Sequence, residues 1–223
     1  MALTDTQIER YSRQIIVPGV GGRAQERLLA ARVAIVAAPA DASATLAYLA
    51  GAGVGRIVVH PVGDGAPYRA MVEQIGDLNS DVSVEIVSDE MPVQCDLMLA
   101  LLGDAPAAEA AARVAREHRC AAAIVARLDM PGRIALLPTP SPCPLCADAD
   151  LLSPPRERAG NAGAIAMVAV AEAFKLLAGF AGQQPEDALI EFDGYVSRTR
   201  ALHPRRRVNG GGEARCACEA AAS

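Results

Sequence analysis

The feature that most constrains this chain is a strand–loop–helix segment over residues 32–55 whose loop contains no glycine. Residues 33–36 form a short apolar, β-branched run, and residues 43–50 have the composition of a helix. This order opens nucleotide-binding α/β domains, where a glycine-rich loop brings backbone N–H groups close to phosphates at a helix N-terminus. Here residues 37–42 read AAPADA, Pro39 has no N–H to donate, and the Asp41 carboxylate, capping the helix, would occupy the place of a phosphate. We therefore predict the frame of a nucleotide site without its phosphate-binding chemistry.

Strand and helix patterns alternate along most of the chain. We expect strands near residues 33–37, 56–60, 82–87, 96–102, 121–126 and 132–137. Between them we expect helices near residues 43–51, 67–77 and 105–118. Such alternation predicts an α/β, Rossmann-like fold with a mostly parallel sheet and helices on both faces.

The two ends of the chain add smaller elements. Thr4 followed by Gln7 is a capping-box pattern, which predicts a helix through about Ile15, and a second helix is expected over about 23–31. An apolar helix at 163–178 and a C-terminal hairpin of 188–192 and 196–202 complete a single domain over residues 1–204. Residues 205–223 are expected to be a flexible, glycine-rich linker and a cysteine-containing tail.

Composition excludes several classes of function. The chain has 223 residues, 52% of them hydrophobic, and a net charge of −5, without a basic stripe or aromatic platform, so we expect no nucleic-acid partner. No apolar run reaches transmembrane length and the N-terminus lacks signal-peptide order, so we expect no membrane partner and a cytoplasmic protein with reduced cysteines. Lys175 is the only lysine, which excludes lysine chemistry near the loop.

Several motifs, in order, resemble the ThiF/MoeB/HesA family, the relatives of ubiquitin-activating enzymes. Residues 10–15 (RYSRQI) are similar to that family's RYxRQ signature, residues 52–55 (AGVG) to its AGVG turn, and residues 143–146 (CPLC) to its CxxC. Residues 25–36 and 171–179 are similar to its first helix–strand unit and its late helix. The resemblance implies a Rossmann-type domain that binds ATP and magnesium and adenylates the C-terminal Gly-Gly of a ubiquitin-like sulfur carrier, usually as a homodimer.

The family's nucleotide-binding residues are missing from the matching positions. Its GxGGLG loop falls on residues 37–42, where every glycine is replaced, and its ribose-binding acid falls near Pro61, between His60 and Asp64. Its arginine segment is reduced to Tyr68-Arg69, its catalytic lysine falls near Pro67, and Asp104 is one acid where the family has two for magnesium. Adenylation needs cations for the phosphates and an acid for magnesium. We therefore predict no catalytic residue and no binding of ATP and magnesium.

Arg13 is the remaining candidate for a nucleotide contact. It matches the arginine that family members donate to the nucleotide across the dimer interface. The alternative is a surface arginine on an N-terminal helix that packs at the interface of a homodimer.

Four cysteines are candidates for a structural zinc site. Cys143 and Cys146 form a CxxC after a proline-rich turn, the spacing of half a tetrahedral zinc site. Cys216 and Cys218 lie where the family has its second pair, spaced as CxC. The alternative is a set of free thiols. The other two cysteines, Cys95 and Cys120, border predicted strands, and we expect them to be buried free thiols.

Three functions remain open. The first is a catalytically degenerate member of the family that binds a ubiquitin-like sulfur-carrier protein or an active paralogue. The second is an ATP-dependent adenylyltransferase that activates the carrier's C-terminus with an altered site. The third, an NAD(P)-dependent oxidoreductase, is disfavoured because the missing glycines would serve its pyrophosphate too.

Overall fold

The apolar segments form the strands of one central sheet. The computed structural model describes residues 2–87, 94–117, 120–138, 159–179, 187–193, 196–201, 207–208 and 214–215. Within these residues, eight strands pair in the order β3-β2-β1-β4-β5-β6-β7-β8. They are β1 (Arg32–Ala37), β2 (Arg56–Pro61), β3 (Ser83–Ile86), β4 (Cys95–Leu102), β5 (Cys120–Arg127), β6 (Gly132–Leu137), β7 (Ala188–Phe192) and β8 (Ser197–Ala201). Pairing is parallel from β3 to β5 and antiparallel from β5 to β8, which confirms the predicted α/β fold.

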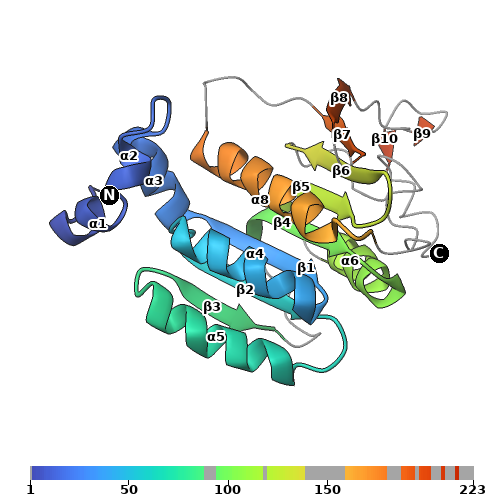
Figure 1. Ribbon diagram of the computed structural model, residues 1–223, viewed down its shortest axis with the longest axis horizontal. Coiled ribbons are helices and arrows are strands. Elements are labelled where there is room, and N and C mark those ends of the chain that lie inside the picture. The colour runs from blue at the N-terminus through green and yellow to red at the C-terminus, as the bar shows by residue number, and fades with distance from the viewer. Residues whose placement is uncertain are drawn as a thin grey trace.

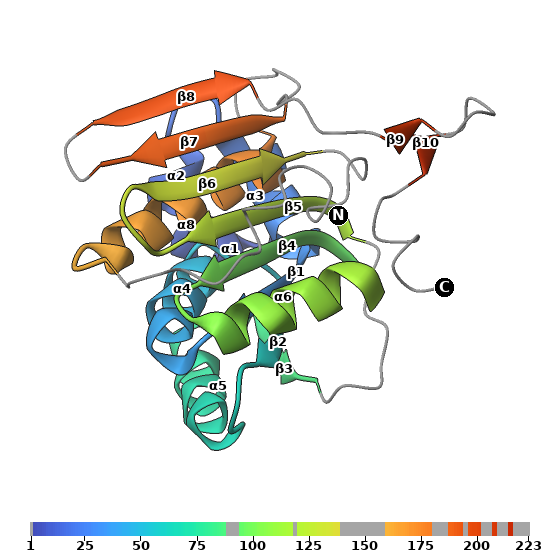
Figure 2. The ribbon, with the colours of Figure 1, turned by 90° about the vertical axis from the view of Figure 1, so that its right-hand side faces the viewer.

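Helices cover both faces of the sheet (Figure 1). They are α1 (Asp5–Arg10), α2 (Ser12–Ile15), α3 (Gly21–Ala30), α4 (Pro39–Gly51), α5 (Ala66–Leu78), α6 (Ala105–Glu117) and α8 (Ala162–Ala178). Figure 2 shows α4, α5 and α8 on one side and α6 on the other. Neighbouring strand residues serve opposite layers: Ile35 packs in the core with α4 and α8, and Val36 in the core with α6. Both faces are therefore buried, as in other parallel sheets.

The N-terminal capping box is confirmed, but the helix that it starts is shorter than predicted. The Gln7 N–H donates to Thr4 Oγ1 (3.2 Å), and the Thr4 N–H donates to Gln7 Oε1 (3.1 Å). The helix ends before Tyr11, whose backbone leaves the helical region (φ −99°, ψ 12°) while its ring is buried. The chain then resumes as α2, because burying this ring takes precedence over a continuous helix.

One further expectation is corrected. Cys95 and Cys120 are not free thiols: they are in register on β4 and β5, with Cα atoms 4.9 Å apart, and form a disulfide. Within residues 205–223, β9 (Arg207–Val208) and β10 (Ala214–Arg215) pair antiparallel, and the flexible linker and tail stay a prediction. Separately, no helix in the described ranges has the length and apolarity needed to cross a membrane.

Candidate functional site

The candidate site is the carboxyl edge of the sheet between β1 and β4. The chain runs outward from β1 through β2 to β3, and β4 then adds on the other side of β1. Strand order therefore reverses between β1 and β4, and open α/β sheets bind ligands outside the carboxyl ends of the strands at such a point. The edge is formed by Ala37 at the end of β1, Leu102 at the end of β4, and the residues that follow them.

The loop after β1 offers few backbone donors to a phosphate. Helix α4 begins at Pro39, earlier than the predicted start near residue 43, and Ala38 is its N-cap without a side-chain hydrogen bond. Pro39 has no N–H, and the N–H groups of Asp41 and Ala42 both donate to the Ala38 carbonyl (2.9 Å each).

Asp41 does not cap the helix, contrary to our prediction. Because Pro39 fits the first helical position, the helix starts before Asp41 and places it inside the first turn. The residue is only 5% exposed, so its carboxylate lies buried at the positive end of the helix. A negative group thus already occupies the region in which a phosphate would need positive potential.

Tyr68 of α5 lies at the same end of the sheet, on the β2 side of β1. Its side chain is fully buried, and its hydroxyl donates to the Ala37 carbonyl (2.7 Å) and accepts from the Val62 N–H (3.0 Å). The phenol thereby joins the end of β1 to the segment after β2. Burial raises the pKa of Tyr68, the hydrogen bond from Val62 lowers it, and the nearby carboxylates of Asp104 and Asp41 raise it further.

The acids considered for ribose and magnesium have local structural roles. Asp104 Oδ1 accepts from the Ala107 N–H (2.8 Å), so Asp104 caps the start of α6. Asp64 Oδ1 accepts from the Ala66 N–H (3.0 Å) at the start of α5. His60 lies within β2 and is 3% exposed.

Sequence reasoning missed two residues at this edge, Tyr68 as a bridging group and Arg127. Arg127 ends β5 beside Leu102, is 4% exposed, and forms an ion pair with Asp129 (Nη2 to Oδ2, 2.5 Å). The Arg-x-Asp spacing was a usable signal for this pair. The spacing of Tyr68, Met71 and Ile75 along α5 could have shown that the ring is buried, but not what the hydroxyl would bond.

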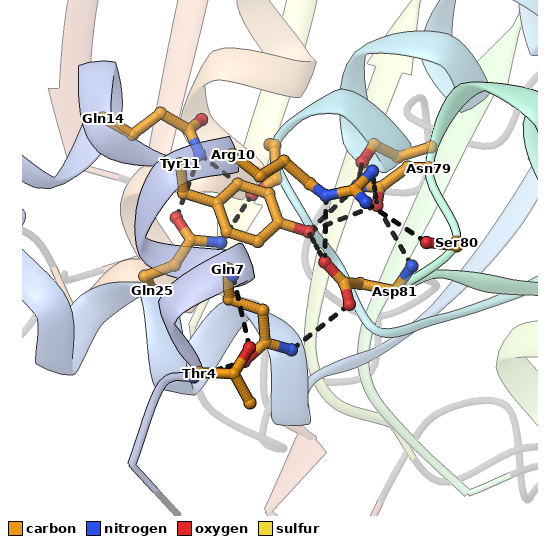
Figure 3. Close-up of polar contacts among 11 residues, drawn as sticks. Thr4, Gln7, Arg10, Tyr11, Gln14, Gln25, Asn79, Ser80 and Asp81 are labelled. Atoms are coloured by element: carbon orange, nitrogen blue, oxygen red, sulfur yellow. Dashed lines mark hydrogen bonds and ion pairs between the residues drawn. The ribbon is translucent and has the colours of Figure 1, made fainter.

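The RYSRQ segment holds the N-terminal helices against the domain (Figure 3). Arg10 donates to Asn79 Oδ1 (3.1 Å) and forms an ion pair with Asp81 (3.2 Å). The Tyr11 hydroxyl donates to Asp81 Oδ2 (3.1 Å) and accepts from Asn79 Nδ2 (3.0 Å). Burial raises the pKa of Tyr11, and the Asn79 hydrogen bond opposes that rise. These contacts fasten α1 and α2 to the turn between α5 and β3.

The same segment also contacts the AGVG turn at residues 52–55. Gln14 Nε2 donates to Gln25 Oε1 (2.9 Å), and Gln25 Nε2 donates to the Ala52 carbonyl (3.0 Å). Gly53 has φ +84°, and a Cβ there would lie 2.6 Å from Gln25 Nε2 and 2.7 Å from the Tyr11 ring. Glycine is therefore required at this position by both conformation and space.

Arg13 lies on α2 and is exposed, as are Arg10 and Ser12 of the same motif. Arg10, Tyr11 and Gln14 are explained by the fold, whereas Arg13 is not. The structure therefore leaves its predicted role at an interface or a nucleotide open.

The four proposed zinc ligands, Cys143, Cys146, Cys216 and Cys218, lie outside the described residues. Among the residues that are described, no group of three or more His, Cys, Asp or Glu side chains is placed to hold a metal ion. The zinc site stays a prediction.

Comparison with known proteins finds similarity over part of the chain. No family model matches the chain. Protein HesA (vegetative) of Trichormus variabilis is 36% identical over 106 residues, which cover 39% of this chain and 40% of HesA. The SAMP-activating enzyme E1 of Haloferax volcanii and the sulfur carrier protein adenylyltransferase of Thermus thermophilus are each 46% identical over 59 residues, covering 26% of this chain and 22% of each relative. The chain thus matches less than half the length of these relatives.

Solved structures agree on the fold. Escherichia coli MccB, crystallised with ATP, superposes with a TM-score of 0.63 at 14% identity, covering 91% of this chain and 73% of MccB. PaaA superposes with a TM-score of 0.63 at 15% identity, covering 90% of this chain and 84% of PaaA. The fold, in which strand order reverses between β1 and β4, is that of a Rossmann-type α/β domain. The sequence matches, each over part of the chain, are to HesA-type and adenylyltransferase proteins, in agreement with the resemblance to the ThiF/MoeB/HesA family that the motifs indicate.

Proposed function

We propose that this chain is a non-adenylating member of the ThiF/MoeB/HesA family that binds a ubiquitin-like sulfur-carrier protein or an active paralogue. The observation that carries the proposal is the start of α4, where Pro39 has no N–H to donate and Asp41 lies buried in the first helical turn. The relatives named as SAMP-activating enzyme and sulfur carrier protein adenylyltransferase support a carrier as the partner class.

The residues at this edge do not fit ATP and magnesium. A triphosphate there would meet the Asp41 carboxylate, and like charges at close range repel. Asp104 would have to abandon the cap of α6 to hold a metal ion. Arg127, the buried cation nearby, is already paired with Asp129. No step of adenylation is therefore derived for this chain.

The proposal includes a homodimer formed through an apolar groove between α4 and α8. The groove has a volume of about 670 Å³ and includes Tyr48, Met167, Phe174 and Gln14 in its lining. Tyr48 is 63% exposed and lines the groove together with Met167 and Phe174, and a contiguous apolar patch of this kind is typical of a protein–protein contact. A second copy related by a two-fold axis would cover both rings at once. Because Gln14 lines the groove, such pairing would bring the neighbouring Arg13 toward the partner.

Zinc and location complete the proposal. Cys143, Cys146, Cys216 and Cys218 would hold one Zn²⁺ as four thiolates, a closed tetrahedral site with no position for water, so its role would be structural. We propose a cytoplasmic location, where these cysteines stay reduced.

The competing function is an adenylyltransferase with an altered site, which the names of the relatives favour. The two are separated by an ATP–pyrophosphate exchange assay with a Gly-Gly-terminated ubiquitin-like sulfur carrier, alongside a titration of carrier binding. We expect carrier binding without exchange, with a carrier lacking its terminal Gly-Gly as the matched control. Carrier-dependent exchange above the protein-free background would overturn the proposal in favour of the enzyme.

A further inference from the structure

A cysteine pair lies at the sheet edge opposite the candidate site. Cys95 and Cys120 are the first residues of β4 and β5 and are paired in the parallel register. Residues in register on neighbouring strands point to the same face, which places the two sulfurs together without any loop movement. The disulfide they form closes the β4–α6–β5 crossover, with a sequence separation of 25.

The pair is open to small molecules from one side. Cys95 is 6% exposed, whereas Cys120 is half-buried. Both line a cavity of about 500 Å³. Its remaining lining consists of Ala30, Arg32, Gln94, Asp96 and Ala121. Arg32 and Asp96 make this wall polar, and the Arg32 N–H donates to Asp96 Oδ2 (2.7 Å). A water-soluble reagent can therefore approach the disulfide from the Cys120 side.

We infer that Cys95 and Cys120 form a reversible thiol–disulfide exchange site for low-molecular-weight thiols, which enter through this cavity. A structural disulfide is usually enclosed, whereas disulfides of reducing compartments are usually transient or redox-sensing. The inference rests on the cytoplasmic location proposed above, but it concerns the opposite end of the strands and needs no nucleotide or carrier.

Reduction proceeds in two balanced steps. The thiolate of a small thiol attacks Cys120 Sγ, forming a mixed disulfide, while the bond to Cys95 Sγ breaks and Cys95 leaves as a thiolate that takes a proton from water. A second thiolate then attacks the small-molecule sulfur of the mixed disulfide and releases Cys120. Two small thiols are oxidised to their disulfide, and the protein disulfide is reduced to a dithiol.

The state of the pair affects α6. This helix lies within the crossover that the disulfide closes, and it packs on the sheet through Ala107, Ala111 and Val114. Reduction restores freedom to the crossover, so we expect α6 amides to exchange with solvent about tenfold faster or more.

The test uses reduced and oxidised glutathione on the full-length, folded chain, with peptide mapping by mass spectrometry. We expect a Cys95–Cys120 linkage in the oxidised protein, its reduction by glutathione without denaturant, and faster hydrogen exchange in α6 but not in α4. These measurements on the unmodified chain do not depend on any variant folding. Absence of the linkage, or reduction only after denaturant unfolds the chain, would overturn the inference.

Two matched variants test the direction of attack. In Cys95→Ser, we expect oxidised glutathione to form a mixed disulfide with Cys120. In Cys120→Ser, the more buried Cys95 should react with oxidised glutathione at a rate lower by about tenfold or more. Equal rates at the two sulfurs would contradict entry from the Cys120 side.

Discussion

Replacing Tyr68 with Phe tests whether the Tyr68 hydroxyl stabilises the fold by joining the end of β1 to the segment after β2. The variant keeps the buried ring but removes the hydroxyl that bonds to Ala37 and Val62. The Val62 N–H would be left without this buried acceptor, which costs about 1–3 kcal/mol, and the lost bond to Ala37 adds about 0.5–1.5 kcal/mol. We therefore expect the free energy of unfolding to fall by about 2–4 kcal/mol, which lowers Tm by roughly 4–16 °C for a chain of this size.

The assay is urea unfolding of Tyr68→Phe beside Tyr48→Phe. Tyr48 is 63% exposed, so loss of its hydroxyl should change the free energy of unfolding by no more than about 0.5 kcal/mol. An unchanged slope against urea would show that the loss belongs to the folded state. If Tyr68→Phe is as stable as the control, the hydroxyl does not join β1 to the segment after β2, and the reasoning is wrong.

Three other predictions follow from the same structure. Gly53→Ala should destabilise the chain by about 2–4 kcal/mol, because Gly53 has φ +84° and no room for a Cβ. Gly51→Ala, where the Cβ would enter open space, should not destabilise the chain, and equal thermal stability of the two variants would refute this prediction. Burial raises the pKa of Tyr68 above 10.0, so its contribution to stability is full below pH 10 and is lost as pH rises through the folded-state pKa. Above pH 10, the free energy of unfolding should therefore fall more steeply with pH in the native chain than in Tyr68→Phe, by up to about 1.4 kcal/mol per pH unit. Parallel pH curves for the two proteins would contradict the raised pKa of Tyr68. Elemental analysis should find about one zinc per chain, lost in Cys143→Ser; metal-free native protein would show that the cysteines are a remnant.

The fold was predictable because its signals are local. The apolar runs at β1, β2 and β4 and the intervening helical segments specify strands and helices through periodicity alone. The Thr4–Gln7 capping box likewise involves residues three apart and was predicted correctly. Boundaries that depend on distant contacts were not: α1 ends early because Tyr11 is buried against Asn79, far along the chain.

The candidate site was predictable in location but not in chemistry. The glycine-free loop indicated a lost phosphate site, and the location at the switch point follows from strand order. The bridging hydroxyl of Tyr68 and the ion pair of Arg127 depend on tertiary packing that periodicity does not report. The Cys95–Cys120 disulfide was missed for the same reason, since strand register, not spacing, brings the two sulfurs together.

Calorimetric titration of the native chain with ATP and magnesium tests the central claim most directly. The account predicts no magnesium-dependent heat of binding at millimolar ATP, because α4 begins at Pro39, which has no N–H, and holds the buried Asp41 in its first turn. Tight, magnesium-dependent binding of ATP, weakened by a substitution such as Arg13→Ala, would contradict it and restore the adenylyltransferase as the function of this chain.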